Sequence, residues 1–381
     1  MKILILCSTL DLTKPFGATP SLWQLLKGFY EEGHELIVIP YHGHAINTLW
    51  WRSVQNPNYY EGVAMDKILR LFNKPSRRVS RISFIPIIAR LLTKPKLYKI
   101  IIETLRQEKN IEAIMMIAVP LNQIKGLANK IKKQYAIPII HYDLDVPTSL
   151  PSHGGFTFNY IKGADLSEYD SIIVPSEGSI TELKELGARD AKVVHFGVDP
   201  DVYKPITVKK DIDFLFFGNG GSSRAKNLKM MITDPSSVLD YKFVVSGRDL
   251  GIDLGRSRIL PPFSFSEWRN FCCRAKINLN VVRDLHANVF STSTSRPFEL
   301  AAMRCCVVSS PYMGLENWFD IGKEILIVKS PKECIEMYGM LIENEELRVK
   351  IGEAAQNRVM KEHTSRHRAR QIIDILKLTH I

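Results

Sequence analysis

Short apolar runs alternate with segments of helical spacing along the chain, and no other feature limits the possible folds as strongly. Residues 2–7 form an apolar run, a helical segment follows at 21–32, and a second apolar run lies at 35–40. Parallel strands need such crossover helices between them, so this order predicts a doubly wound α/β sheet. The expected strands are 2–7, 35–40, 113–117, 138–141, 170–174 and 192–196 in a first series and 213–217, 242–246, 275–280, 305–309 and 324–328 in a second.

A cluster of turn-forming residues, GVDPDVYKP at 197–205, separates the two series. Its prolines discourage both helix and strand. A chain of 381 residues is long enough for two cores. We therefore expect two tandem Rossmann-like domains, 1–203 and 204–362, that face each other across a crevice in which ligands bind.

The cysteines and the length of the apolar runs indicate a cytoplasmic protein. Two adjacent cysteine pairs lie in apolar surroundings and no Cys-x-x-Cys spacing occurs, which is typical of buried reduced thiols. The sequence has no run of about 18 apolar residues that could span a membrane. The short apolar start is followed by Asp11 and Lys14 and lacks a signal-peptide cleavage site. Peripheral attachment to the inner face of the membrane stays an option.

Most of the net charge of +11 lies at 66–110, a segment with twelve Lys or Arg and three Asp or Glu. Between residues 67 and 109, aliphatic residues at helical spacing alternate with these cations. Such a surface suits an anionic bilayer, to which each nearby Lys or Arg contributes about 1 kcal/mol. Core helices with a solvated charged face would give the same pattern. Nucleic acid fits less well, because the segment lacks interleaved aromatic residues for base stacking.

The stretch 289–318 has the pattern of a polar loop, a helix and a buried strand. Hydroxylated residues at 291–295 lead into a helical segment with Pro297 near its first turn. Free backbone N–H groups and the positive end of the helix dipole suit an anion such as phosphate. Glu299, one turn on, is then available to ligand hydroxyls. A capped helix whose Glu299 interacts with its own N-terminus is the structural alternative.

Two Rossmann-like halves joined by GVDPDVYKP resemble the GT-B glycosyltransferases, and this junction is similar to the family-4 linker. The second half also resembles the glycosyltransferase-like domain of spore-maturation proteins. The matching segments are SRPFELAAMRCCVVSS at 295–310, GLENWF at 314–319 and HTSRHRA at 363–369. The resemblance covers about residues 170–375. It implies transfer of a hexose from a nucleoside diphosphate sugar to an acceptor, without a metal ion or another cofactor. It also implies that 363–381 crosses back to the first domain through the apolar stripe of Ile372, Ile373, Ile375 and Leu376.

The resemblance also assigns donor-binding residues. Glu299 matches the glutamate that binds the ribose of the nucleotide. The other matches are the diphosphate loop (Ser293, Thr294, Ser295, Arg296), the basic glycine-rich turn at the leaving phosphate (Gly218, Arg224, Lys226), a second glycine turn (Gly247, Arg248) and the base-packing position (Phe263). Such a set suits the reaction, because fixed cations stabilise a leaving diphosphate without a proton donor.

One position departs from the family pattern. Retaining family-4 enzymes carry two glutamates eight positions apart, the first of which contacts the donor sugar, and Ser291 stands in its place here. The departure puts the sugar, and the retaining stereochemistry that the resemblance implies, in question. Asp284 or His286 would be the substitutes nearest in the chain.

Candidate catalytic residues in the first half follow the expected strand at 138–141. Asp143 could accept a proton from an acceptor hydroxyl, and His141 or His153 could bind the donor sugar or take part in catalysis. Each could instead be a polar residue that caps a loop. Asp143 and Asp145 also mimic the Asp-x-Asp metal motif, but that motif belongs to a single-domain glycosyltransferase fold, so we expect no metal ion.

The sequence therefore predicts a metal-independent GT-B glycosyltransferase with an acceptor that it does not identify. A nucleotide-sugar epimerase of the same fold is the alternative among enzymes, since it needs the same nucleotide site but no large acceptor surface. A non-catalytic basic protein that binds a membrane or nucleic acid is the alternative from another class.

Overall fold

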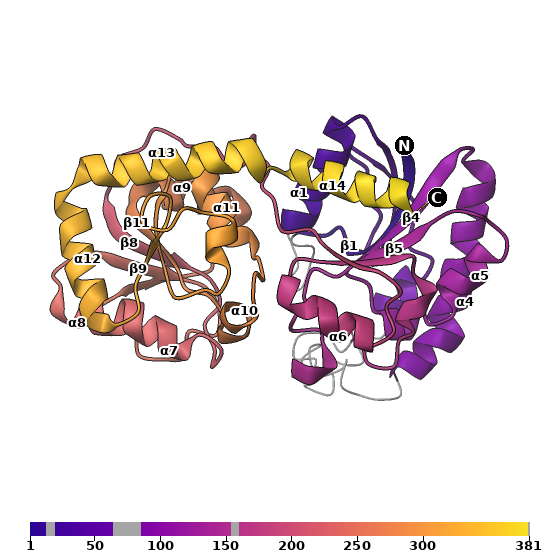
Figure 1. The fold of residues 1–381 in the computed structure, drawn as a ribbon, viewed down its shortest axis with the longest axis horizontal. Coiled ribbons are helices and arrows are strands. Elements are labelled where there is room, and N and C mark those ends of the chain that lie inside the picture. Colours follow the sequence, from indigo (N-terminus) through magenta and orange to yellow (C-terminus); the bar gives the residue numbers. More distant parts are fainter. Residues whose placement is uncertain (13–19, 64–84, 154–159, 380–381) are drawn as a thin grey trace. The chain divides into compact units, whose positions relative to one another are not determined.

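The computed structural model describes residues 1–12, 20–63, 85–153 and 160–379 (Figure 1). The chain forms two compact units: the first contains residues 1–195 and 365–381, and the second contains residues 196–364. The boundary lies after residue 195 and not after residue 203, where the turn-forming residues had suggested it. Val198 and Tyr203 are buried in the core of the second unit, which is why their segment belongs to it.

The first unit is built on a seven-stranded parallel sheet in the order β3-β2-β1-β4-β5-β6-β7. Its strands are β1 Lys2–Thr9, β2 Glu35–His42, β3 Arg52–Ser53, β4 Ile111–Ile117, β5 Ile139–Tyr142, β6 Ser171–Val174 and β7 Ala191–Val193. Its α-helices are α1 Pro20–Glu31, α4 Ile85–Gln107, α5 Leu127–Lys132, α6 Ile180–Glu185 and α14 Ser365–Leu378. Its 3-10 helices are η1 Leu121–Gln123, η2 Pro151–His153, η3 Leu166–Glu168 and η4 Glu177–Ser179.

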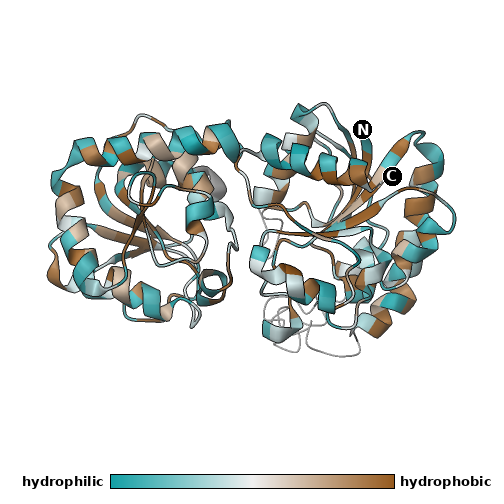
Figure 2. Ribbon diagram, viewed as in Figure 1, coloured by the Kyte–Doolittle hydropathy of each residue, from teal (hydrophilic) through white to brown (hydrophobic). Residues whose placement is uncertain are grey.

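The central strands of this sheet are apolar on both faces because helices cover both faces (Figure 2). On β1, Ile3 and Ile5 pack in one cluster with residues of α1 and α14. The alternate residues Leu4 and Leu6 pack in another cluster with residues of α4 and α5. This two-sided burial explains why the strands were visible in the sequence as continuous apolar runs.

Helix α14, at the end of the chain, packs against α1 within the first unit. The two helices meet backbone to backbone, since a Cβ atom on Gly28 would lie 2.7 Å from the carbonyl oxygen of Ser365. An ion pair of 2.9 Å between Arg366 and Glu31 adds to the contact. Ile372 is completely buried there.

The second unit is built on a six-stranded parallel sheet in the order β10-β9-β8-β11-β12-β13. Its strands are β8 Ile212–Phe217, β9 Phe243–Ser246, β10 Arg258–Leu260, β11 Ala275–Asn280, β12 Cys306–Ser309 and β13 Leu326–Ile327. Its helices are α7 Ala225–Leu228, the π-helix η5 Lys229–Thr233, α8 Asp234–Val238, α9 Phe265–Arg274, α10 Asp284–Asn288, α11 Ser295–Ala302, the 3-10 helix η6 Leu315–Asn317, α12 Pro331–Glu343 and α13 Glu345–Glu362.

Both sheets have the strand order of the Rossmann fold, 3-2-1-4-5-6 when each is numbered from its own first strand, and the first sheet adds a seventh strand next to its sixth. This order confirms the predicted fold class of two doubly wound α/β domains. In each sheet the order reverses between the first and the fourth strand, which are β1 and β4 in the first unit and β8 and β11 in the second. None of the helices in the described ranges is long and apolar enough to cross a membrane.

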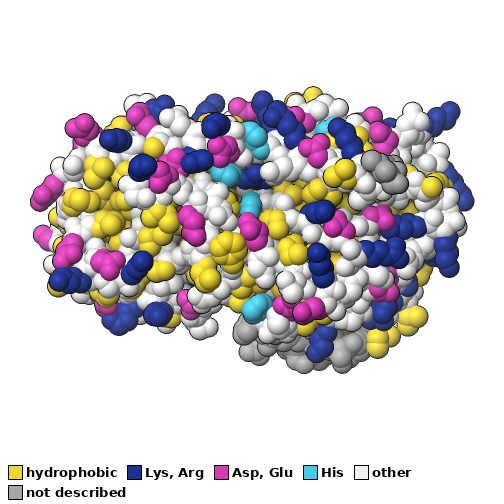
Figure 3. Space-filling model, in the orientation of Figure 1, with side chains coloured by type: hydrophobic (Ala, Val, Ile, Leu, Met, Phe, Trp, Pro, Cys, Tyr) yellow, Lys and Arg dark blue, Asp and Glu magenta, His cyan; other side chains and the backbone are white. Residues whose placement is uncertain are grey.

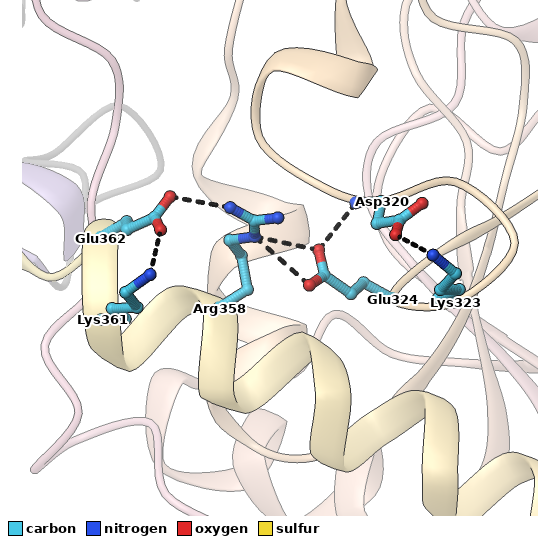
Figure 4. A network of polar contacts seen from close by, with 6 residues as sticks. All are labelled: Asp320, Lys323, Glu324, Arg358, Lys361 and Glu362. Carbon is cyan, nitrogen blue, oxygen red and sulfur yellow. Dashed lines mark hydrogen bonds and ion pairs between the residues drawn. The ribbon is translucent and has the colours of Figure 1, made fainter.

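Helix α13 holds α11 and the loop before β13 in place. The Gln356 side chain donates to the carbonyl oxygen of Ala302 at 2.8 Å and so satisfies the end of α11. Figure 4 shows the polar network on the last turns of α13, where Arg358 contacts Glu324 at 3.2 Å and Glu362 at 3.0 Å. Glu324 also accepts the backbone N–H of Asp320 at 2.7 Å, so the network ties this loop to the helix.

The contact between α1 and α14 gives a first prediction. Gly28→Ala should destabilise the first unit by about 1–3 kcal/mol, because the added Cβ atom meets the backbone of Ser365 and the helices must move apart. Gly339→Ala is the matched control: Gly339 lies inside α12 with no atom near the position of a Cβ. It should be neutral or slightly stabilising. Thermal unfolding of both variants measures the difference, and equal midpoints would contradict the backbone contact.

Candidate functional site

The carboxyl ends of β8 and β11 lie side by side where the strand order of the second sheet reverses. Ligands of open α/β sheets bind outside such a switch point. Arg224 bridges the two strand ends. Its Nε donates to the carbonyl oxygen of Val281 at 2.9 Å, and its Nη1 donates to that of Asn219 at 2.8 Å. One guanidinium group therefore holds the loops after both strands.

Two glycine turns that the resemblance places near the donor pack against each other. The Gly218 N–H donates to the carbonyl oxygen of Ser246 at 2.9 Å, and the Gly220 N–H donates to that of Arg248 at 2.8 Å. A Cβ atom on Gly247 would lie 1.8 Å from the carbonyl oxygen of Gly218, so no other residue fits there. Gly247 is therefore required because the two loops approach each other closely at this point.

Positive charge gathers at this edge of the second sheet. Burial lowers the pKa of Arg224 to about 9, and the charges of Arg283 and Arg296 act in the same direction. His286, on α10, is buried, and burial followed by Arg283 and Arg224 lowers its pKa to about 3. Its Nδ1 has no hydrogen-bond partner among the described residues. The site therefore combines three guanidinium groups with a neutral imidazole, an arrangement suited to an anion.

Aromatic rings support one of these cations. The Arg296 guanidinium lies over the rings of Trp268 and Phe217, at 4.2 Å and 4.7 Å from their centroids. Its Nη1 atom is buried and has no hydrogen-bond partner within the described part of the chain. Phe263 stacks on Phe217 at 5.5 Å and on Phe271 at 3.9 Å. The predicted base-packing residue and the predicted diphosphate residue Arg296 thus share Phe217.

The N-terminus of α11 lacks a side-chain cap. Thr294 is the N-cap residue in extended conformation, and its side chain makes no capping hydrogen bond. Ser295 is the first residue of the helix, and its first turn contains no acidic residue. The Ser293 hydroxyl is buried and accepts the backbone N–H of Phe196 at 3.0 Å. The helix end therefore keeps a positive dipole end, while Ser293 fixes the chain before it.

Glu299 lies on α11 and is buried, with 4% of its surface exposed. The Tyr203 phenol lies close enough for the charge of Glu299 to act on it. Burial first, and then the charge of Glu299, raise the pKa of this phenol well above its ordinary value.

Ser291 stands where retaining family-4 enzymes have their first glutamate. Ser291 is completely buried, has a positive φ of 50°, and accepts a hydrogen bond from the Asn317 side chain at 3.1 Å. The backbone of Gly314 lies against it, since a Cβ atom on Gly314 would be 2.6 Å from the Ser291 nitrogen. The serine is therefore part of the local packing.

Two other predicted donor residues are exposed. Lys226 is on α7, and Arg248 lies in the turn after β9. The charge of Arg296 acts on Arg224, so these two predicted residues lie near each other.

In the first unit, two of the three candidate catalytic residues are buried. His141 lies within β5, with 2% of its surface exposed, and burial lowers its pKa to about 3. Asp143 follows β5, and its two oxygens accept the backbone N–H of Asp145 at 2.7 Å and the hydroxyl of Ser149 at 2.8 Å. These bonds are those of a residue that organises a loop. His153, at the end of η2, is partly exposed. In the described ranges no group of three or more His, Cys, Asp or Glu could hold a metal ion.

Comparison with known proteins identifies this architecture. Sucrose-phosphate synthase from Thermosynechococcus elongatus is similar over 99% of this chain and 99% of its own, with 12% identity and a TM-score of 0.67. HepE from Anabaena, in complex with UDP-glucose, is similar over 99% of this chain and 100% of its own, with 14% identity and a TM-score of 0.63. The fold is that of the GT-B glycosyltransferases. A glycosyltransferase from Rickettsia africae is similar over 99% of this chain and 98% of its own, with 13% identity and a TM-score of 0.60.

The model of the glycosyl transferase-like family matches residues 224–374 of this GT-B chain. The matched range begins at Arg224 and includes α11 with Glu299. These findings confirm the resemblance to GT-B glycosyltransferases inferred from the sequence. No curated protein matches the chain.

Sequence reasoning missed three side chains at this site of the GT-B fold. Arg283 follows β11 directly, and its position after a predicted strand was a usable signal. Tyr203 and Trp268 gave no such signal, because one lies in the segment taken as a linker and the other on a helix with an ordinary apolar face. Only the folded chain brings them to Glu299 and Arg296.

The buried histidine of β5 gives a prediction on acid stability. The folded protein holds the pKa of His141 at about 3, below the ordinary 6.5, so below pH 6.5 the unfolded chain binds the proton more readily. The free energy of unfolding should therefore fall between pH 7 and pH 5, by about 2 kcal/mol from this residue. Urea unfolding of His141→Asn should show a shallower pH dependence. His44→Asn, which changes an exposed residue, is the control, and equal slopes in all three proteins would refute the prediction.

Proposed function

We propose that this GT-B protein transfers a sugar from a nucleoside diphosphate donor to an acceptor hydroxyl. The donor binds at the carboxyl edge of the second sheet. The observation that carries the proposal is the cluster of Arg224, Arg283 and Arg296 at the switch point. The positive charges of these residues repel one another. Cations held together in this way are stabilised by a ligand with two negative groups, such as a diphosphate.

The N-terminus of α11 completes the diphosphate site in this proposal. Backbone N–H groups of Ser295 and Arg296 at the uncapped helix end are suited to phosphate oxygens. As the bond between sugar and phosphate breaks, negative charge grows on the leaving diphosphate. Fixed guanidinium groups and a helix dipole stabilise that charge without moving at the moment of reaction. These groups suit transfer without a metal ion.

Glu299 takes the ribose of the nucleotide in this proposal. A buried carboxylate accepts hydrogen bonds only, so a pair of adjacent hydroxyls is a fitting ligand for it. Phe263 stacks on Phe217 and on Phe271, and in this proposal the base packs against the aromatic cluster that these rings form. The complex of HepE with UDP-glucose makes uridine diphosphate the first nucleotide to try.

His286 is our choice for the contact to the donor sugar, in place of the glutamate missing at Ser291. Its neutral imidazole has an unpartnered Nδ1, whereas Asp284 accepts a hydrogen bond from Asn227 at 3.3 Å. Retention of the anomeric configuration remains a prediction of the resemblance alone. On the acceptor side, the partial exposure of His153 favours it over the buried His141 and Asp143 as a catalytic residue.

The acceptor in this proposal is linked to a membrane, and α4 contacts the bilayer. Four aliphatic side chains lie on adjacent turns of the exposed side of α4, namely Ile87, Ile88, Leu91 and Leu92, with 55%, 37%, 70% and 62% of their surfaces exposed. The opposite side of the helix is anchored by Leu97 and Ile101, which are completely buried. A protein in water gains nothing from such a stripe, whereas insertion into lipid would bury it.

Cations flank this aliphatic stripe. Arg90 and Lys94 lie on the same turns and donate to the carbonyl oxygens of Asn122 and Lys125, each at 2.9 Å. Figure 3 shows Lys and Arg side chains gathered over the region of α4 and α5. Their charge favours an anionic lipid surface. Other basic residues of the same segment, Lys67, Arg77, Arg78 and Arg81 among them, lie outside the described residues.

Binding of uridine diphosphate tests the donor site. Arg296→Met keeps an apolar side chain over Trp268 but removes the charge, and should weaken binding of uridine diphosphate about 10- to 100-fold, since hydrogen bonds to charged groups are worth about 1.5–3 kcal/mol. Arg258→Met removes an exposed charge from the edge strand β10 and is the matched control. Isothermal titration measures both variants. A normal affinity in Arg296→Met, or no binding of any nucleoside diphosphate to the native protein, would contradict the proposal.

Vesicle co-sedimentation tests the membrane contact. The double variant Leu91→Ser and Leu92→Ser should reduce binding to vesicles of phosphatidylglycerol at least about tenfold, because it removes the most exposed part of the stripe. Val349→Ser changes an aliphatic residue on α13 that is 51% exposed and should bind as the native protein does. Binding should also weaken as salt rises. The membrane contact would be contradicted if the native protein bound phosphatidylcholine vesicles as well as anionic vesicles, or if it did not bind anionic vesicles at all. Either result would favour a water-soluble acceptor.

A further inference from the structure

The loop that follows β5 in the first unit is held by its own hydrogen bonds and by the core. Asp143 accepts the backbone N–H of Asp145 at 2.7 Å with one oxygen and the hydroxyl of Ser149 at 2.8 Å with the other. Val146 and Leu150 are each 1% exposed and pack in the core cluster that also contains residues of α4 and α5. The loop is therefore a fixed part of the first unit as far as residue 150.

The 3-10 turn η2 continues this loop and is held by helix α6. The carboxylate of Glu182 accepts the backbone N–H of Ser152 at 3.2 Å with one oxygen and the Ser152 hydroxyl at 2.6 Å with the other. Leu183, the next residue of the helix, is completely buried in the same core cluster as Leu150. The N–H of His153 donates to the carbonyl oxygen of Leu150 at 3.2 Å. The turn that ends at His153 is thus bonded both to the loop and to α6.

The bonds of Glu182 differ from those that its position in the helix would favour. A glutamate in the first turn of a helix commonly bonds to the start of its own helix. Glu182 is in the first turn of α6, yet both of its oxygens bind Ser152, which lies 30 residues earlier in the chain. Hydrogen bonds to a carboxylate are charge-assisted and stronger than bonds between neutral groups. Glu182 therefore fixes the backbone next to His153, while the imidazole itself is partly exposed.

We propose that Glu182 is a positioning residue for His153 in the transfer reaction. This inference rests on the proposed function, which favours His153 as the catalytic residue on the acceptor side. A displacement of about 1 Å in a group that takes part in a reaction can lower the rate about 100-fold. Glu182 has no contact with the reacting atoms in this proposal, and it acts only through the backbone of Ser152 and His153.

The test measures release of uridine diphosphate from UDP-glucose, with water as the acceptor. The water oxygen bonds to the sugar carbon, the bond from that carbon to the diphosphate breaks, and the proton passes to His153 and then to solvent. His153→Ala should lower kcat about 100-fold, the effect of losing a general base. Glu182→Ala should lower kcat about fivefold to tenfold and leave KM unchanged. Isothermal titration should show native affinity for uridine diphosphate in both variants, because the proposed donor site is in the second unit.

A double variant separates positioning from stability. In a protein that already has His153→Ala, the change Glu182→Ala should lower kcat no further, because there is no imidazole left to position. A merely structural role predicts the same factor with and without His153. Glu185→Ala is the matched control, since Glu185 is an exposed glutamate at the end of the same helix, and it should react at the native rate.

The outcomes distinguish the inference from the function beneath it. A loss of rate in Glu182→Ala that is absent without His153 supports the inference. If Glu182→Ala has the native rate, or lowers the rate equally in both backgrounds, Glu182 is not a positioning residue and the assignment of His153 stands. A native rate in His153→Ala would refute that assignment and the inference with it. If the native protein released no uridine diphosphate, the proposed function and the inference would both be contradicted.

Discussion

The bridge that Arg224 makes between the ends of β8 and β11 is the interaction on which the proposed donor site depends. It holds the backbone of Asn219 and Val281, and with them the two loops at the switch point of the second sheet. Its position has a cost, because burial and the charges of Arg283 and Arg296 lower its pKa to about 9. Charged groups that are partly desolvated beside like charges destabilise the free protein. A bound anion would offset that cost. The arrangement of the three arginines is therefore better explained by the binding of an anion than by a purely structural role.

Much of the fold could be predicted because its strands are buried on both faces. Each inner strand appears in the sequence as a continuous apolar run, and β1, β8 and β11 lie where such runs were found. The edge strands β3 and β10 were missed. Each has only two or three residues, and pairing at a sheet edge leaves no apolar pattern to detect. Helix α5 begins at Leu127, after the 3-10 helix η1, and its N-cap residue Gly126 has a φ of 86°.

The candidate site was predictable in its residue types and less so in their partners. Position in a motif indicates that Glu299 and Arg296 belong near a donor. The phenol of Tyr203 near Glu299 and the aromatic ring under the Arg296 guanidinium depend on long-range packing. The glycine turns illustrate the same limit. Their sequence indicates close approach of a backbone, and the structure shows that the neighbouring loop is what approaches Gly247. Asp143 and His141 follow the rule that polar residues gather at strand ends, yet their burial favours the loop-capping alternative.

The packing around Ser291 carries the argument one step further. A buried serine at this position supplies no carboxylate for the sugar contact of the family pattern. In the proposed function, a different element therefore contacts the donor sugar. His286 is on the helix that precedes this loop, and burial first, with the charges of Arg283 and Arg224 after it, lowers the pKa of its imidazole to about 3. A neutral imidazole can exchange hydrogen bonds with a sugar hydroxyl but adds no charge to the site. The burial and the positive charge that suit a diphosphate therefore also favour the form in which His286 would meet the sugar.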